Sequence, residues 1–204
     1  MPQEQLPVVE VQFEEARKLA DLASIYQDLS YVVDALERLK VLLDEDSDDH
    51  VLIQSYWTAA LISYVRCFST GKRLGLSESI FDSWDGAAEV HQFYRNLRDK
   101  HIAHSVNPFE QIVVGLVLSA ARGEGRGVEG VATLSQKLIA ETSEGVETLL
   151  RLAKFAHGVV ARQAKEYEKS VLEIGKNLAV DGLYSKASLR TVTPGPQDSD
   201  KARR

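Results

Sequence analysis

The chain has 204 residues, a formal net charge of −6 and a pI of about 5.4. This acidic balance excludes a protein that coats nucleic acid through a generally basic surface. Hydrophobic residues at 44% and charged residues at 26% are typical of a globular chain, so the chain as a whole is not disordered, and its length favours one domain with tails. The single cysteine, Cys67, cannot form an internal disulfide. We find no export signal and no apolar run of about 20 residues, so we expect a cytoplasmic protein without a membrane span.

Two amphipathic helices are expected in the first part of the chain. Apolar residues recur every three or four positions over residues 13–43, which predicts the first helix. An acidic turn follows at residues 44–49, and its last aspartates are suited to cap the next helix. The second helix is expected over about residues 50–73, closed by Gly71 and Gly75.

A third helix is expected over about residues 84–104. Asp82 or Ser83 offers an N-cap. Asn107 precedes Pro108, and a residue before proline is pushed out of the α region, which ends the helix. Upstream of the first helix, residues 8–11 are either a short strand or an extended lead-in.

The pattern changes after Pro108. Residues 110–119 and 128–134 are rich in β-branched and aliphatic residues, and a glycine-rich loop separates them, so we predict a β-hairpin insertion at about 110–134. Helical spacing returns from Ser135, with a possible interruption near Gly145 or Gly158.

These elements predict a mainly α protein, an antiparallel helical bundle with a small β-hairpin insertion. The expected organisation is an N-terminal lead-in (1–12), a helical-bundle domain (13–180) and a flexible C-terminal tail (181–204).

Titratable side chains concentrate at the end of the third predicted helix. Histidine exchanges protons near neutral pH, and the planar arginine fork fits a phosphate. The mixture therefore suits phosphodiester chemistry without a metal. The residues concerned are His91, Arg95, Asn96, Arg98, Asp99, Lys100, His101 and His104.

This segment resembles the signature of the HEPN superfamily of helical-bundle proteins, in which an arginine, usually followed by a polar residue, precedes a histidine by four to six intervening positions. Arg98-Asp99-Lys100-His101-Ile102-Ala103-His104 fits, and so does the overlapping register Arg95-Asn96-Leu97-Arg98-Asp99-Lys100-His101. The phrase RDKHIAHSVNPFEQ and the preceding AALISYVRCFSTGKR look like bacterial HEPN proteins of toxin and abortive-infection type. A third match runs from Arg151 to His157. We discount it because Arg151 is followed by the apolar Leu152 and lies inside a helix.

The resemblance implies a metal-independent endoribonuclease without a cofactor, and it suggests the toxin of a toxin–antitoxin or phage-defence system. It implies a homodimer that places both copies of the motif in one cleft, an RNA substrate and an antitoxin protein as a possible partner. It assigns acid–base chemistry to His104, phosphate binding to Arg98 and an orienting role to Asp99. Arg95, Asn96 and His101 are the secondary catalytic candidates. Arg66, Lys72, Arg73 and Lys100 are candidate RNA-binding residues.

Structural roles for the same residues stay open at this point. Arg95 and Asp99 are spaced as a surface ion pair, His104 is placed to hydrogen-bond the carbonyls of a helix end, and His101 is placed to pack in a core. The alternative function is a catalytically silent HEPN-like helical module that binds a partner protein or a nucleotide.

Overall fold

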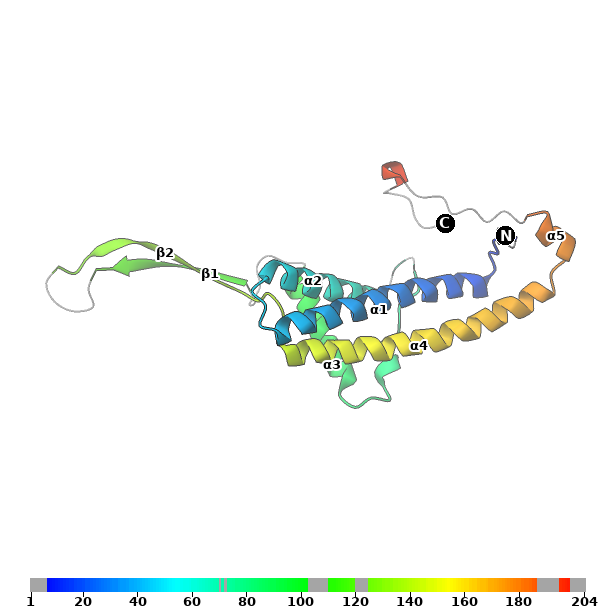
Figure 1. Cartoon of the computed structure of the whole chain (residues 1–204), viewed down its shortest axis with the longest axis horizontal. Helices are drawn as coiled ribbons and strands as arrows, with labels where there is room; N and C mark the ends of the chain where they lie inside the picture. Colours follow the sequence, from blue (N-terminus) through cyan, green and yellow to red (C-terminus); the bar gives the residue numbers. More distant parts are fainter. Residues whose placement is uncertain are drawn as a thin grey trace. The chain divides into compact units, whose positions relative to one another are not determined.

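A computed structural model describes residues 7–69, 71, 73–102, 110–119, 125–186 and 195–198. The protein is mainly helical, with 65% of the described residues in helices, and it contains an antiparallel hairpin (Figure 1). The chain divides into two compact units, one of residues 21–164 and the other of residues 1–20 and 165–204. In the described part of the chain no helix combines the length and the apolar character that a membrane span requires.

Five α-helices, two strands and three short helical segments follow one another along the described chain. The α-helices are α1 (Glu14–Asp44), α2 (His50–Cys67), α3 (Ala87–Leu97), α4 (Ser143–Lys176) and α5 (Val180–Tyr184). The strands are β1 (Glu110–Leu118) and β2 (Val128–Lys137). The short segments are the 3-10 turns η1 (Glu78–Phe81) and η3 (Pro196–Asp198) and the π-helical η2 (Arg98–Ile102).

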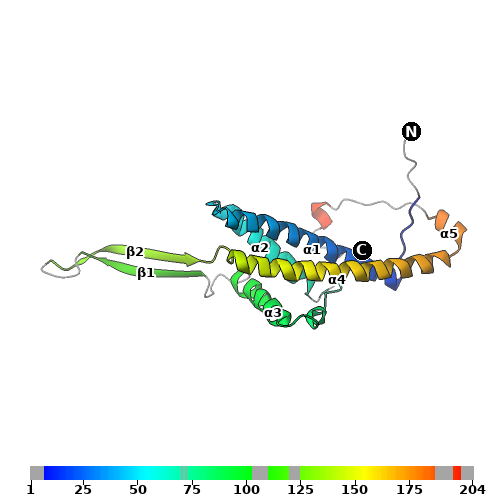
Figure 2. The same cartoon turned by 60° about the horizontal axis from the view of Figure 1, so that its bottom comes forward.

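Helices α1 and α4 run antiparallel through the larger unit. The Ser143 hydroxyl donates a hydrogen bond to the Asp44 carboxylate. Lys154 forms an ion pair with Glu37, and the ring of Tyr26 packs on that of His157. Helices α2 and α3 complete this bundle (Figures 1 and 2). The predicted helix is confirmed, and four of its eight predicted apolar positions lie in the core: Leu22, Leu29, Leu36 and Leu39. Tyr26, which was also predicted on this face, is exposed, and Ile25, Val32 and Ala35 are buried in addition.

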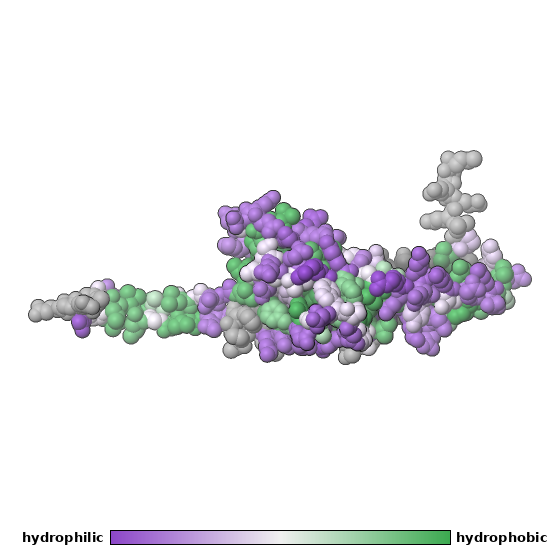
Figure 3. All heavy atoms as spheres, turned by 90° about the horizontal axis from the view of Figure 1, so that it is seen from below, coloured by the Kyte–Doolittle hydropathy of each residue, from purple (hydrophilic) through white to green (hydrophobic). Residues whose placement is uncertain are grey.

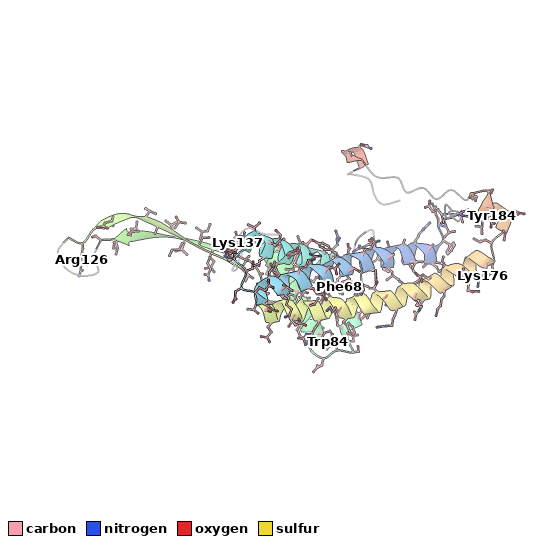
Figure 4. The ribbon with its side chains drawn as sticks, in the orientation of Figure 1. Phe68, Trp84, Arg126, Lys137, Lys176 and Tyr184 are labelled. Carbon is pink, nitrogen blue, oxygen red and sulfur yellow. The ribbon has the colours of Figure 1, made fainter. Side chains whose placement is uncertain are left out.

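The bundle core is aromatic around α2. Trp57 and Tyr64 of α2 are fully buried. Phe68 follows α2 and stacks on Phe81 with ring centroids 5.7 Å apart, and Phe81 in turn contacts Phe155 of α4. Figure 4 labels Phe68 and also Trp84, whose ring lies 5.5 Å from that of Phe155. The predicted cap of α2 is confirmed, because the Asp49 carboxylate accepts a hydrogen bond from the Leu52 backbone N–H at 2.9 Å.

Several predicted helix boundaries are wrong. Helix α2 ends at Cys67 rather than near residue 73, because the chain turns back and the Leu76 N–H donates to the Cys67 carbonyl at 2.8 Å. Helix α3 begins after Gly86, whose φ of 74° is the left-handed conformation that glycine adopts at no steric cost, and not at Asp82 or Ser83. The residues before it form η1, which buries Phe81.

The predicted hairpin is confirmed, and β1 pairs with β2 in antiparallel register with Val114 opposite Thr133. Strand β2 continues to Lys137, so the last long helix begins at Ser143 instead of Ser135, and it passes Gly145 and Gly158 without interruption. Residues 8–11 form no strand. Most of the predicted tail lies outside the described residues.

Candidate functional site

The Arg/His motif begins where α3 changes its helical form. Regular α-helix ends at Leu97, and Arg98–Ile102 continue as a π-helix, whereas the sequence led us to expect one regular helix to residue 104. Short π-helical segments are rare and frequently occur at functional sites. The motif therefore lies on irregular backbone, and the side-chain spacing of a regular helix does not apply to it.

Arg98 and Asp99 form an ion pair in this segment. The Arg98 Nη1 atom lies 2.8 Å from the Asp99 Oδ1 atom, and the two side chains are 29% and 49% exposed. Neighbouring residues of a regular α-helix do not face each other, so this contact accompanies the change of helical form. The Arg98 Nε atom is buried and has no hydrogen-bond partner in the described structure. A buried donor without a partner is costly, and this one belongs to the arginine that the motif singles out.

The overlapping register is held by other contacts. Arg95 pairs with Glu78 of η1, and Asn96 accepts a hydrogen bond from Gln92 at 3.0 Å. The ion pair between Arg95 and Asp99 that their spacing suggested is not the one that forms. Arg95 instead ties α3 to η1 by a contact that no local sequence pattern signals.

His91 is a core residue. It is fully buried, with its ring 4.4 Å from that of Phe68 and its Nδ1 atom 2.9 Å from the Tyr64 hydroxyl. Its Nε2 atom lies 3.7 Å from the Glu78 carboxylate, which favours the tautomer with hydrogen on Nε2 and Tyr64 donating to Nδ1. Burial lowers the pKa of His91, partly offset by Glu78, so the ring is neutral at pH 7 and enclosed.

Two candidate RNA-binding arginines share one acidic partner on α1. The Arg66 Nη2 atom lies 2.5 Å from one oxygen of Asp28, and the Arg73 Nη1 atom lies 2.7 Å from the other. Arg73 also donates to the Ser24 hydroxyl at 3.0 Å. This cluster fastens the turn after α2 to α1. The sequence analysis missed Asp28, since nothing near it in the sequence indicates a partner.

The remaining candidates are placed only in part. Lys100 is exposed on the π-helical segment. His101 belongs to the same segment by its backbone, and its side chain is not among those described. His104 and Lys72 lie outside the described residues. The described geometry therefore brings together Arg98 and Asp99, and separately Arg66 and Arg73.

The third match to the motif lies inside α4, as we expected. The His157 Nε2 atom lies 3.0 Å from the Ser30 hydroxyl oxygen, and the His157 ring centroid is 4.1 Å from that of Tyr26. Burial lowers the pKa of His157. These contacts with α1 give the histidine a packing role, while Arg151 is exposed and donates a hydrogen bond to the Thr148 hydroxyl at 3.4 Å.

Across the described ranges, no group of three or more His, Cys, Asp or Glu side chains is arranged to hold a metal ion. The fold and the Arg98–Asp99 pair thus define a helical-bundle protein with a polar motif at a π-helical helix end. Comparisons with protein-family models, curated proteins and solved structures found no match.

Proposed function

We propose that the protein is a metal-independent endoribonuclease of HEPN type that acts as a homodimer. The observation that carries the proposal is the Arg98–Asp99 pair on the π-helical end of α3. Arg98 forms no other ion pair or hydrogen bond with a described residue, whereas Arg95 and Asn96 are engaged by Glu78 and Gln92. This difference favours the register that runs from Arg98 to His104 over the one that runs from Arg95 to His101.

The reaction needs a base, a cation and an acid. RNA supplies the nucleophile, which is its own 2′-OH. The neutral imidazole of His104 takes the proton of this hydroxyl, and the 2′-oxygen attacks the adjacent phosphorus. The bond from phosphorus to the 5′-oxygen breaks, and this oxygen leaves with a proton from the imidazolium of His104 in the second copy of the chain. The products are a 2′,3′-cyclic phosphate end and a 5′-OH end. The Arg98 guanidinium stabilises the extra negative charge of the phosphorane, and Asp99 holds the guanidinium in place.

A cleavage assay in excess EDTA tests the proposal. Purified protein is incubated with tRNA and mRNA, and we expect cleavage whose products carry cyclic phosphate ends. His104→Ala should reduce the rate about 10²–10⁴-fold, the usual contribution of a general acid or base. Arg98→Ala should reduce it about 10²–10³-fold, and Arg98→Lys should restore little because lysine lacks the planar fork.

Arg151→Ala is the matched control. Arg151 also starts an Arg/His match, but it is exposed on α4, so its loss should leave the rate unchanged. Melting temperatures of all variants separate catalytic loss from misfolding. Absence of cleavage by wild type in EDTA, or equal rates for His104→Ala and Arg151→Ala, would overturn the proposal and favour a silent binding module. A toxin role predicts in addition that overexpression of wild type, and not of His104→Ala, arrests growth.

A further inference from the structure

The hairpin presents aliphatic side chains to solvent on both of its faces. We call β1, β2 and the described residues between them the arm. None of its described residues is buried. Figure 3 shows hydrophobic surface over much of the arm, and Figure 4 marks its ends with Lys137 and Arg126. Contiguous apolar surface of this kind marks an interaction site, and a two-stranded hairpin without cover is marginally stable in water.

One face of the arm carries aliphatic side chains along the whole of β1. Strand residues two apart share a face, and Leu116 lies opposite Val131 in the register. This face, which we call the aliphatic face, presents Ile112, Val114, Leu116, Leu118 and Val131, each 64–68% exposed. Thr133 and Ser135 of β2 lie on the same face, opposite Val114 and Ile112. The opposite face has fewer aliphatic side chains. It carries Val113, Val117 and Leu134, and Gly115 and Gly130 interrupt it.

The charges of the arm favour a symmetric partner. No charged residue occurs within 111–118 or 130–136. In a twofold dimer a residue near the axis meets its own copy, and a charge there would repel itself, so an uncharged middle suits such an axis. Residues 110–137 carry three acidic and three basic residues. This balance lacks the excess of cations that a membrane surface or a nucleic acid would attract.

We propose that the aliphatic face of the arm packs against the same face of a second copy of this chain. Its five side chains present roughly 300 Å² of apolar surface per copy. Since about 65% of a homodimer interface is apolar, two copies would form an interface of about 900–1000 Å² in total. An interface of this size belongs to weak, reversible dimers, so the dimer should form at micromolar concentration.

The first experiment measures the mass of the full-length protein by sedimentation from about 0.5 to 100 µM. Wild type should pass from monomer to dimer. Leu116→Lys should raise the dissociation constant at least about 10-fold, because the substitution places two like charges near the axis. Val117→Lys, on the opposite face, is the matched control and should leave the dissociation constant within about threefold. The arm contributes nothing to the buried core among the described residues, so both variants should keep the wild-type melting temperature.

A second experiment locates the axis. Val114→Cys, in the middle of the aliphatic face, should form an intermolecular disulfide under mild oxidation, and Val113→Cys on the opposite face should not. The native thiol of Cys67 does not compete, since it is buried and its pKa is raised to about 12.

Three results would overturn the proposal. They are a wild type that stays monomeric throughout, equal weakening by Leu116→Lys and Val117→Lys, and a wild type that floats with lipid vesicles as a monomer. The proposal stands on the arm and not on RNA cleavage, so a protein that dimerises without cutting RNA would refute only the proposed function.

Discussion

Asp28 joins two cationic side chains that the sequence assigned to RNA binding, and replacing it separates their structural and binding roles. Asp28→Asn removes the negative charge while keeping the shape of the side chain. Arg66 and Arg73 would then lose their common anionic partner. Stability should therefore fall. RNA affinity should rise if these arginines also contact phosphate, because two cations are freed at once.

The magnitude follows from the exposure of each side chain. Arg66 is 58% exposed, so its pair contributes about 0–1 kcal/mol after solvent screening. Arg73 and Asp28 are 23% and 15% exposed, and a hydrogen bond to a charged group in such a setting contributes about 1.5–3 kcal/mol. We expect Asp28→Asn to lower the free energy of unfolding by about 2–3 kcal/mol, a drop in melting temperature of about 4–12 °C.

Urea denaturation at pH 7 measures this loss. Glu37→Gln is the matched control, because Glu37 is also an acid of α1 in an ion pair, with Lys154, and is 51% exposed. Glu37→Gln should lower the free energy of unfolding by less than about 1 kcal/mol. A double-mutant cycle of Asp28→Asn with Arg73→Ala should show a coupling of at least about 1 kcal/mol. Equal losses for Asp28→Asn and Glu37→Gln, or no coupling to Arg73, would refute the view that this cluster fastens the turn after α2.

Three further predictions concern pH, packing and salt. Burial lowers the pKa of His91 below its usual 6.5, so as the pH falls through 6.5 the unfolded chain binds a proton first. The free energy of unfolding should therefore decrease by up to about 1.4 kcal/mol per pH unit below 6.5, and urea titrations of His91→Gln should lack this contribution. Gly75→Ala should lower the free energy of unfolding, measured by urea denaturation, by about 1–3 kcal/mol, because its Cβ would lie 2.6 Å from the Ser69 carbonyl oxygen. A Cβ at Gly71 meets no atom within 4 Å, so Gly71→Ala should cause a much smaller loss. RNA binding by a His104→Ala dimer can be followed by fluorescence anisotropy over a KCl series. The logarithm of the association constant should fall with the logarithm of the KCl concentration with a slope of about −3, as expected for four cations on single-stranded RNA. A slope steeper than about −5 would contradict a contact limited to Arg98 and Lys100 of each copy.

The helices with strong local patterns could be predicted from the sequence. The first helix was placed to within a residue at each end, because its apolar positions keep one spacing over more than 30 residues. The hairpin was found because a run of β-branched residues on each side flanks a glycine-rich loop. The end of α2 and the start of α3 were misplaced, since both depend on contacts of the intervening segment, such as the hydrogen bond from Leu76 to Cys67.

The partners of the candidate site residues were beyond sequence reasoning for a similar reason. Asp28 is 38 residues from Arg66 and 45 from Arg73, so no helical or strand period relates them. Glu78 is 17 residues from Arg95 and belongs to a 3-10 turn that the sequence did not indicate. The π-helical form of residues 98–102 likewise has no signature in composition or hydropathy, although it determines how Arg98 meets Asp99.

The positive charge available to RNA is smaller than the linear sequence suggests. Arg66 and Arg73 share the single negative charge of Asp28, which leaves this cluster a net charge of +1, and Arg95 is balanced by Glu78. At the motif itself the described candidates are Lys100, and Arg98 with its neighbour Asp99. One copy of the chain thus offers too few cations near the motif to hold an RNA backbone well at physiological salt. A site that acts on RNA through this motif therefore needs two copies of the motif. The self-complementary arm, which follows the motif directly in the sequence, offers a physical means of bringing two copies together.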